Sequence, residues 1–326
     1  MRSKLQCLAA FALAGLLCVP PAIGWGNEGH LWINRAAALN MPLDYPKFMR
    51  TPAAVEQIEY LGPEPDRWRS ATEPSLKNAQ EPEHFIDLEM LAGFESAMGP
   101  LPVRRFDYYH QLAEFARGQA EKGNPQAKFL TPEKIGLQPW ATAEMWQRLI
   151  VAFREYRQLK AEHKPTAGAE QAAILYAGVL GHYVGDAANP LHTTVRYNGW
   201  TGRNPEGYTT SHKIHSQFES IYVKDNLKPA EVRIGLHRAT ALYDDNQAAA
   251  GGWQAEWDDY IDYLKHSNEL VEPLYKLEED GGFEGRGTPE GHKFVVDRLT
   301  AGAQMLSDMW YTAWKQSAVE LAARKH

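Results

Sequence analysis

The chain has 326 residues, with 34 basic and 41 acidic side chains, a formal net charge of −7 and only two cysteines. This balance argues against a groove that binds nucleic acid through Lys and Arg alone, because such grooves are usually strongly basic. It leaves open an enzyme that holds phosphate through bound cations, since the ions then supply the positive charge.

The first 24 residues predict a secretory signal peptide. Arg2 and Lys4 form a charged start, an apolar stretch follows, and Ala22 and Gly24 occupy the small-residue positions before a cleavage site. The apolar stretch is shorter than the roughly 20 residues that a membrane-spanning helix needs. We therefore expect cleavage after Gly24, a mature chain that begins at Trp25, and a secreted or periplasmic location.

Both cysteines, Cys7 and Cys18, lie in this predicted signal peptide. The mature protein would then form no disulfide, although exported proteins commonly use them. Bound metal ions are a candidate for holding its loops instead. Loss of Arg2 and Lys4 from the 34 basic residues would leave 32 against 41 acidic ones, a net charge of −9.

The mature chain shows helical periodicity almost throughout. Apolar residues recur at spacings of three and four, which predicts helices over 27–39, 141–163, 168–188, 229–249, 253–279 and 289–322. Loops rich in Pro and Gly are predicted over 62–82, 198–208 and 280–288. Alternating strand-like runs are scarce, and no linker divides the chain. We predict one all-α domain over 25–326.

Two pairs of histidine and carboxylate carry the same offset on predicted helices. His182 and Asp186 are four residues apart, as are His215 and Glu219, and His192 follows the break at Pro190. Side chains at this offset project from one helix face, which offers two ligands to one cation. A surface ion pair is the alternative for each pair, and His212 is a rival to His215 as a ligand.

Further candidates lie nearer the N-terminus. An α-amine on Trp25 could bind a metal as a neutral nitrogen, with His30 one helical turn further on. The stretch PEPDRWRS contains Asp66 and Arg69, and EPEHFIDLE contains His84, Phe85 and Asp87. A polar turn and a short apolar segment with solvated acids are the alternative interpretations of these two stretches.

Taken in order, these pieces resemble the superfamily of zinc-dependent phospholipases C and single-strand nucleases, which includes the fungal and plant nucleases called S-one and P-one. The resemblance rests on WGNEGH (25–30), the Asp in PEPDRWRS, HFID (84–87), HYVGDAANPLH (182–192) and HSQFE (215–219). It covers most of the mature chain. The ordered set is specific, although no single piece is.

The resemblance implies three zinc ions per chain. One would bind Asp66, His84, His182 and Asp186; a second would bind His192, His215 and Glu219; a third would bind the amine and carbonyl of Trp25, His30 and a shared oxygen of Asp186. It also implies that a zinc-bound hydroxide attacks phosphorus, with Asp66 and Arg69 in the catalytic site, Arg69 against the phosphoryl group. Phe85 and Asp87 would stack on and hydrogen-bond a base.

Features of the sequence are divided between the two substrate classes of this superfamily, nucleic acids and phospholipids. The spacing from Asp66 to Arg69 and the long gap from His192 to His215 favour a nuclease. The lack of a Gly-Gly-Asn hairpin in this gap and Asn189 in place of the usual Gln count against a nuclease. The His-Ser-x-Phe-Glu form of the last ligand pair is closer to the phospholipase version. The aromatic residues of the intervening loop could stack on a base, line a choline cage or pack the loop; they are Tyr197, Trp200 and Tyr208.

We therefore predict a secreted zinc-dependent phosphodiesterase, an endonuclease acting on single-stranded DNA or RNA, with 3′-nucleotidase activity as an accompanying reaction. A phospholipase C acting on phosphatidylcholine-like lipids is the first alternative. A non-catalytic exported protein stabilised by zinc is the second. We expect a monomer without a membrane span.

Overall fold

The computed structural model describes residues 25–242 and 253–323, and the regular elements within them are all helical. The longer helices are α1 (Gly26–Leu39), α2 (Pro52–Leu61), α6 (Arg105–Glu121), α8 (Gln138–Ala161), α9 (Ala167–Ala188), α14 (Trp253–Glu269), α15 (Val271–Glu279) and α16 (Pro289–Ala323). The prediction of an all-α fold is confirmed. The predicted signal peptide and its cleavage site lie outside the described residues.

Short helices and helical turns connect the long helices. The α-helical ones are α3 (Glu64–Arg69), α4 (Pro74–Gln80), α5 (Phe94–Met98), α7 (Pro132–Ile135), α10 (Ile214–Ser216), α11 (Tyr222–Asn226) and α12 (Pro229–Ile234). The 3-10 turns are η1 (Lys47–Arg50), η2 (Glu81–His84), η3 (Leu88–Leu91), η4 (Pro125–Phe129) and η5 (Pro190–His192), and η6 (Gln217–Ile221) is a π-helix.

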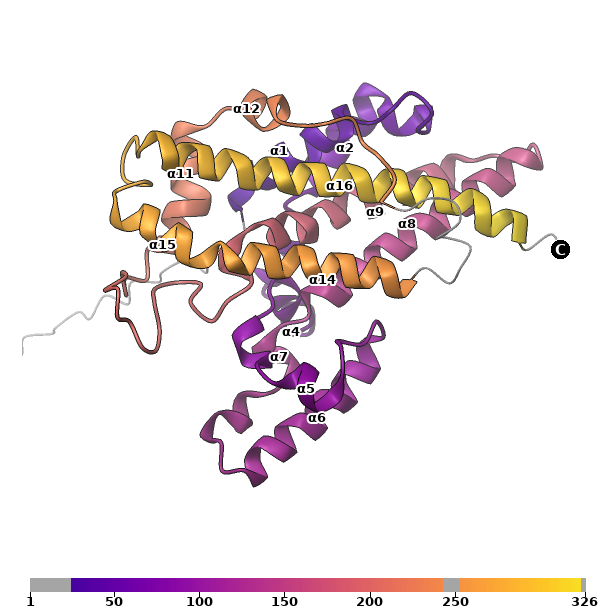
Figure 1. Ribbon diagram of the computed structural model, residues 1–326. Coiled ribbons are helices and arrows are strands. Elements are labelled where there is room, and N and C mark those ends of the chain that lie inside the picture. Colours follow the sequence, from indigo (N-terminus) through magenta and orange to yellow (C-terminus); the bar gives the residue numbers. More distant parts are fainter. Residues whose placement is uncertain (1–24, 243–252, 324–326) are drawn as a thin grey trace, which may run out of the picture.

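Helix α9 is the centre of the molecule. It packs against α8, α16, α2 and α1, and every residue from 177 to 188 is buried. The second half of this helix is apolar on all sides apart from His182 and Asp186, and such a segment requires cover on all sides. Figure 1 shows α16 and α14 lying across α8 and α9. The two charged side chains of α9 that reach this interior, His182 and Asp186, are therefore remote from bulk water.

Close packing around α9 depends on small residues. A Cβ atom at Gly181 would lie 1.8 Å from Oδ1 of Asn34 on α1, and one at Gly178 would lie 2.5 Å from Leu61 on α2. The Asn34 amide donates to the carbonyls of Ile58 at 2.7 Å and Gly178 at 2.9 Å. One buried side chain thus ties α1, α2 and α9 together, which fixes the frame that carries the site.

A lobe formed by α5, α6, η4 and α7 projects from the body of the molecule (Figure 1). Its own aromatic contacts include Phe94 against Phe115, with ring centroids 5.4 Å apart. Tyr108 stacks on Trp140 of α8 at 3.9 Å, which anchors the lobe to the body.

The predicted helix over 229–249 is confirmed over 229–234 and wrong over 235–242. Helix α12 ends at Ile234, and the following chain runs along α16 without helical hydrogen bonds. Its backbone N–H groups instead donate to side chains of α16: His237 to Gln304, and Thr240 to Asp308 at 2.8 Å. Tertiary partners thus replace the helical bonds that the periodicity predicted. Residues 243–249 lie outside the described residues.

Two further boundaries differ from prediction. The predicted helix over 253–279 is broken at Leu270 into α14 and α15, because Pro273 has no N–H and its ring would clash with the carbonyl of Glu269 in a continuous helix. The predicted loop over 62–82 contains α3, α4 and the start of η2. Its prolines sit in the first turns of these short helices, where a missing N–H is harmless.

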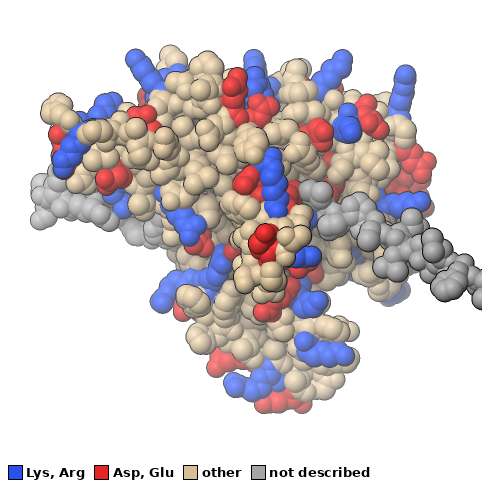
Figure 2. Space-filling model, turned by 180° about the vertical axis from the view of Figure 1, so that it is seen from behind, with Lys and Arg blue, Asp and Glu red and all other residues tan. Residues whose placement is uncertain are grey.

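The surface carries charges of both signs. Figure 2 shows Lys and Arg interspersed with Asp and Glu on one face, without a continuous basic stripe. Among the helices of the described ranges, none combines the length and the apolarity that crossing a bilayer requires.

Candidate metal centre

The first residues of the site lie in the last two turns of α9. His182 and Asp186 lie on one face of this helix, with Nε2 of His182 3.2 Å from Oδ2 of Asp186. Pro190 follows the end of α9, and the Asn189 side chain accepts a hydrogen bond from the Leu191 N–H at 3.0 Å. The η5 turn thereby brings His192 back beside Asp186, whose Oδ1 lies 3.5 Å from its Nδ1.

The first ligand group consists of His84, His182 and Asp186. Nδ1 of His84 lies 2.8 Å from Nε2 of His182 and 3.2 Å from Oδ2 of Asp186. Oδ1 of Asp66 lies 3.7 Å from the same His84 nitrogen. Nδ1 of His182 pairs with the Gly62 carbonyl at 2.9 Å, which assigns the proton to that nitrogen and leaves the Nε2 lone pair for a cation.

The second group consists of His192, His215 and Glu219. Nε2 of His215 lies 2.6 Å from Oε2 of Glu219 and 3.2 Å from Nε2 of His192. Nδ1 of His192 pairs with the carbonyl of His84 at 2.7 Å, so a backbone contact orients this imidazole and joins the two groups. Glu219 lies within the π-helix η6, a rare conformation that is frequent at functional sites.

The third group consists of His30, Asp66 and His182. Nε2 of His30 lies 3.9 Å from Oδ2 of Asp66 and 3.4 Å from Oδ1 of Asp186. Both oxygens of Asp186 therefore face ligand nitrogens, Oδ2 toward the first group and Oδ1 toward His30. This is the position expected of a carboxylate shared between metal ions.

Trp25 lies at the start of α1, one turn before His30. Its side chain is fully buried, its indole N–H donates to the Gly185 carbonyl at 2.7 Å, and its own carbonyl accepts the Gly29 N–H at 3.2 Å. The structure thus places Trp25 beside α9. His30 lies 3.4 Å from Oδ1 of Asp186, as the resemblance implied, and Asp66 and His182 are its further neighbours in the third group. The amine of Trp25 as a ligand stays a prediction.

The buried polar atoms of these groups test whether metal ions fit. Eight of them find no hydrogen-bond partner among the described residues: Nδ1 and Nε2 of His30, both oxygens of Asp66, Nε2 of His84, Oδ1 of Asp186, Nδ1 of His215 and Oε1 of Glu219. Buried polar atoms without hydrogen bonds destabilise a fold, and a bound cation would offset this for the atoms that face it. Imidazole nitrogens and carboxylate oxygens without sulfur are ligands that zinc accepts. The three groups are consistent with three zinc ions.

The protonation states of three histidines and of Asp186 suit metal binding. Burial would lower the pKa of His182, but the nearby Asp186 and Asp66 raise it. Burial lowers the pKa of His30 and His215, and it lowers the pKa of His84 to about 3, so these imidazoles are neutral at neutral pH. Burial would raise the pKa of Asp186, but His192 and His182 outweigh it and hold that pKa well below its usual range. Neutral imidazoles and ionised carboxylates are the forms that bind metal.

Glu219 behaves differently from Asp186. Burial raises its pKa well above the usual range, and the nearby charge of Asp186 raises it further. The Asn189 amide donates to Oε2 of Glu219 at 3.1 Å, which opposes this shift. Glu219 therefore needs a nearby cation to ionise in this environment.

One cavity of about 1200 Å³ opens onto the ligand groups. The ligands His84, His192 and His215 line it, together with Arg69, Ser70, Lys77, Asn78, Glu81, Phe85, Asp87, Glu133, Lys134, Leu191, Tyr197, Asn198 and His212. The site is thus accessible to a substrate much larger than water. His212 is exposed and belongs to none of the three groups, so the structure favours His215 as the ligand.

Arg69 lies at the junction of cavity and ligands. Its Nε is 3.2 Å from Oδ1 of Asp66, and its Nη2 is buried without a hydrogen-bond partner among the described residues. The contact between Asp66 and Arg69 on α3 therefore orients the guanidinium group and leaves its Nη2 to bind an anionic group. The sequence-predicted Asp66 and Arg69 are brought together as expected.

Phe85 and Asp87 both line the cavity, on a segment that is rigidly held. The Ile86 N–H donates to the His192 carbonyl at 2.9 Å, and the Asp87 N–H donates to the Ile135 carbonyl at 2.7 Å. Burial, reinforced by Glu89, raises the pKa of Asp87 to about 7. Near neutral pH this carboxyl can therefore either donate or accept a hydrogen bond.

Comparison with protein-family models gave no match, and comparison with curated protein sequences gave none. Among solved structures, alpha toxin from Clostridium absonum aligns with 90% of this chain and 64% of the toxin chain, at 13% sequence identity and a TM-score of 0.40. The chain thus spans less than two thirds of the length of that toxin. At this similarity the likeness carries no weight for function, which has to be judged from the site itself.

Proposed function

We propose that this chain is a secreted or periplasmic zinc-dependent phosphodiesterase that cleaves single-stranded DNA or RNA. The observation that carries the proposal is the opening of the buried ligand groups onto one large cavity beside Arg69. A zinc site that serves stability alone is closed by protein ligands, whereas a catalytic one keeps a position open. The accessible cavity therefore supports an enzyme over a zinc-stabilised structural protein.

The reaction assigned to the cavity is hydrolysis of a phosphodiester. When bound, zinc supplies Lewis-acid chemistry that activates water at neutral pH and offsets charge on phosphoryl oxygens. Arg69 would hold the phosphoryl group, because a planar guanidinium fork matches its oxygens and complements the charge that spreads over them. Asp66 orients that fork through Nε. With the required cations held inside the site, a net charge of −7 is no obstacle to a polyanionic substrate.

The walls of the cavity support a nucleic acid over a choline lipid. A choline cage needs several aromatic faces around one cation. Trp200 and Tyr208 instead pack on Tyr275, with ring centroids 5.1 and 5.7 Å apart, and neither lines the cavity. Phe85 and Asp87 do line it, and a ring beside a hydrogen-bonding group suits a flat base. All the proposed ligands come from one chain, so a monomer suffices.

The test is a side-by-side assay of the mature protein on single-stranded DNA, RNA, 3′-nucleotides and phosphatidylcholine. We expect cleavage of the single strands, loss of activity on chelation and recovery with zinc. The Arg69→Ala variant, purified identically, controls for contaminating nucleases. Turnover of phosphatidylcholine alone would replace the nuclease by a phospholipase C, and no turnover of any phosphodiester would leave the non-catalytic alternative.

A further inference from the structure

The loop between His192 and His215 presents one aromatic side chain to the cavity. Trp200 and Tyr208 pack on each other at 4.7 Å, and Tyr208 is 2% exposed. The Trp200 indole N–H also donates to the Arg203 carbonyl. Tyr197, in contrast, is 49% exposed and lines the cavity. Two of the three loop aromatics thus hold the loop in place, and Tyr197 is left free to contact a substrate.

The backbone on both sides of Tyr197 and Asn198 is fixed. The Tyr275 hydroxyl donates to the Arg196 carbonyl at 2.5 Å and accepts the Gly199 N–H at 3.1 Å. Gly199 has a φ of +104°, and a Cβ atom there would lie 2.8 Å from the Thr210 carbonyl oxygen. These contacts hold the backbone of this segment in place before any substrate arrives, which reduces the entropic cost of binding.

Asn198 offers an unused acceptor to the same cavity. Its Oδ1 is buried and accepts no hydrogen bond from the described residues, and the residue lines the cavity next to Tyr197. A buried acceptor without a donor costs free energy. A ligand that brings an N–H group would remove that cost. A ring face beside an acceptor matches a nucleobase, which is flat and carries N–H groups on its edge.

Tyr197 and Phe85 lie against different ligand groups. The Tyr197 ring meets the His215 ring edge-on, with centroids 5.7 Å apart, so it adjoins the second group. Phe85 directly follows His84 of the first group. The two aromatic side chains thus line one cavity from segments that carry different ligand groups.

We propose that Tyr197 and Asn198 form a second base-binding subsite. Tyr197 stacks on the base across the scissile phosphodiester from the one at Phe85 and Asp87, and Oδ1 of Asn198 accepts an N–H from that base. The subsite rests on the proposed nuclease function and sharpens it. The substrate is then a strand that presents a base on each side of the cleaved bond.

The test compares two oligonucleotides, one with both bases and one whose single cleavable bond has an abasic residue on the Tyr197 side. Stacking on an aromatic side chain contributes about 1–3 kcal/mol per base. Tyr197→Ala should therefore raise KM for the complete strand on the order of 10-fold, with kcat nearly unchanged, and leave the abasic strand unaffected. Tyr197→Phe should behave as the unaltered protein, and Asn198→Ala should raise KM by a smaller factor.

Two controls separate this subsite from other effects. Phe106→Ala removes an aromatic side chain that is 72% exposed on α6, outside the cavity, and should change neither strand. Zinc content shows whether Tyr197→Ala disturbs His215. If the unaltered protein cleaves no nucleic acid, the proposed function fails. If it cleaves both strands and Tyr197→Ala leaves both unchanged, or slows both equally with loss of zinc, the subsite alone is overturned.

Discussion

The pKa values of two buried carboxyl groups in this molecule are shifted in opposite directions. Asp186 on α9 is surrounded by four imidazoles, with His84 and His182 at 3.2 Å, His30 at 3.4 Å and His192 at 3.5 Å. Glu256 on α14 is 2% exposed and accepts a hydrogen bond from the Gln316 amide of α16. Burial raises the pKa of Glu256 to about 7, whereas the imidazoles hold the pKa of Asp186 well below its usual range.

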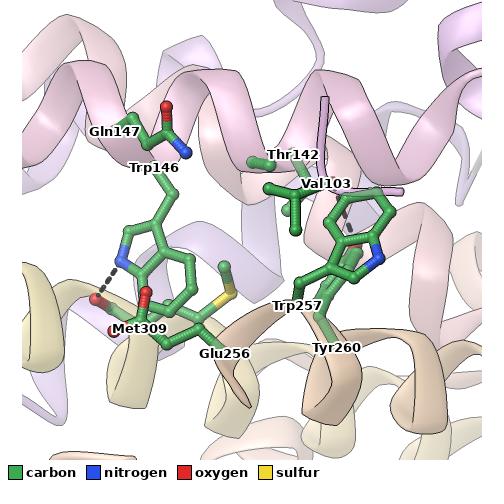
Figure 3. Close-up of a pocket in the computed structure, with 9 residues that line it drawn as sticks. Val103, Thr142, Trp146, Gln147, Glu256, Trp257, Tyr260 and Met309 are labelled. Atoms are coloured by element: carbon green, nitrogen blue, oxygen red, sulfur yellow. Dashed lines mark hydrogen bonds between the residues drawn. The ribbon is translucent and has the colours of Figure 1, made fainter. Parts of the chain in front are cut away.

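The two carboxyl groups also differ in the size of the cavity beside them. Glu256 borders a pocket of about 10 Å³, which holds at most about one water molecule. Figure 3 shows Trp146 and Trp257 on either side of this pocket, near Tyr260 and Met309. The ligand groups around Asp186 open instead onto about 1200 Å³. A buried acid thus indicates a functional site only when ligand partners and access accompany it.

The largest effect is expected for Asp186→Asn. The amide removes the charge that faces four imidazoles, one of them in the second group and one in the third group, so activity should fall more than about 100-fold, beyond the loss from any single His→Ala change. Metal analysis should find fewer zinc ions per chain. Glu256→Gln is the matched control, since it makes the same change at the other buried acid and should retain the full zinc content. Normal zinc content with normal turnover in Asp186→Asn would contradict a shared carboxylate.

Arg69→Ala should have the next largest effect. Loss of the group that would hold the phosphoryl oxygens should lower kcat/KM about 10²- to 10³-fold, while zinc content stays unchanged. Arg69→Lys retains the charge without the planar fork and should recover only part of the activity. Equal rates for all three proteins on every phosphodiester tested would remove Arg69 from the reaction.

Asn189 provides a smaller and more local test. Its amide donates to Glu219, and its Oδ1 accepts the Leu191 N–H that starts the turn carrying His192. Asn189→Ala should weaken zinc binding to the second group about 10- to 100-fold, measured by competition with a chelator. Asn189→Asp keeps the acceptor for Leu191 but not the donor to Glu219, so it separates the two roles. Unchanged zinc affinity in both variants would show that Asn189 does not support this group.

Glu256→Gln should have the smallest effect. Because the pKa of Glu256 rises from 4.5 to about 7 on folding, the protonated carboxyl stabilises the fold below about pH 4.5, and this contribution is lost as the pH rises through 7. The neutral amide cannot titrate. The variant should therefore show a smaller fall in Tm between pH 5 and 8, with activity nearly unchanged. A Tm profile parallel to that of the unaltered protein would assign the pH dependence to other groups.

Local periodicity was sufficient to predict part of the site. The offset of four residues places His182 with Asp186, and His215 with Glu219, wherever a helix forms, because one helical turn brings such side chains to the same face. The largely apolar pattern of 168–188 likewise predicted burial, which the structure confirms over 177–188, and the long α16 followed from its regular spacing. The break in 253–279 lies beside Pro273, whereas the apolar periodicity continues across it, so periodicity alone predicts one helix.

The sequence by itself therefore determined the helices and the local ligand pairs, which depend on contacts within a turn or two of chain. The tertiary structure alone decided that His30 joins Asp66 and His182, that His212 stays outside the groups, and that Tyr197 faces the cavity while Trp200 and Tyr208 pack on Tyr275. These outcomes depend on contacts between segments far apart in the chain, and such contacts exist only after α1, α3, α9, α15 and the loop have packed together.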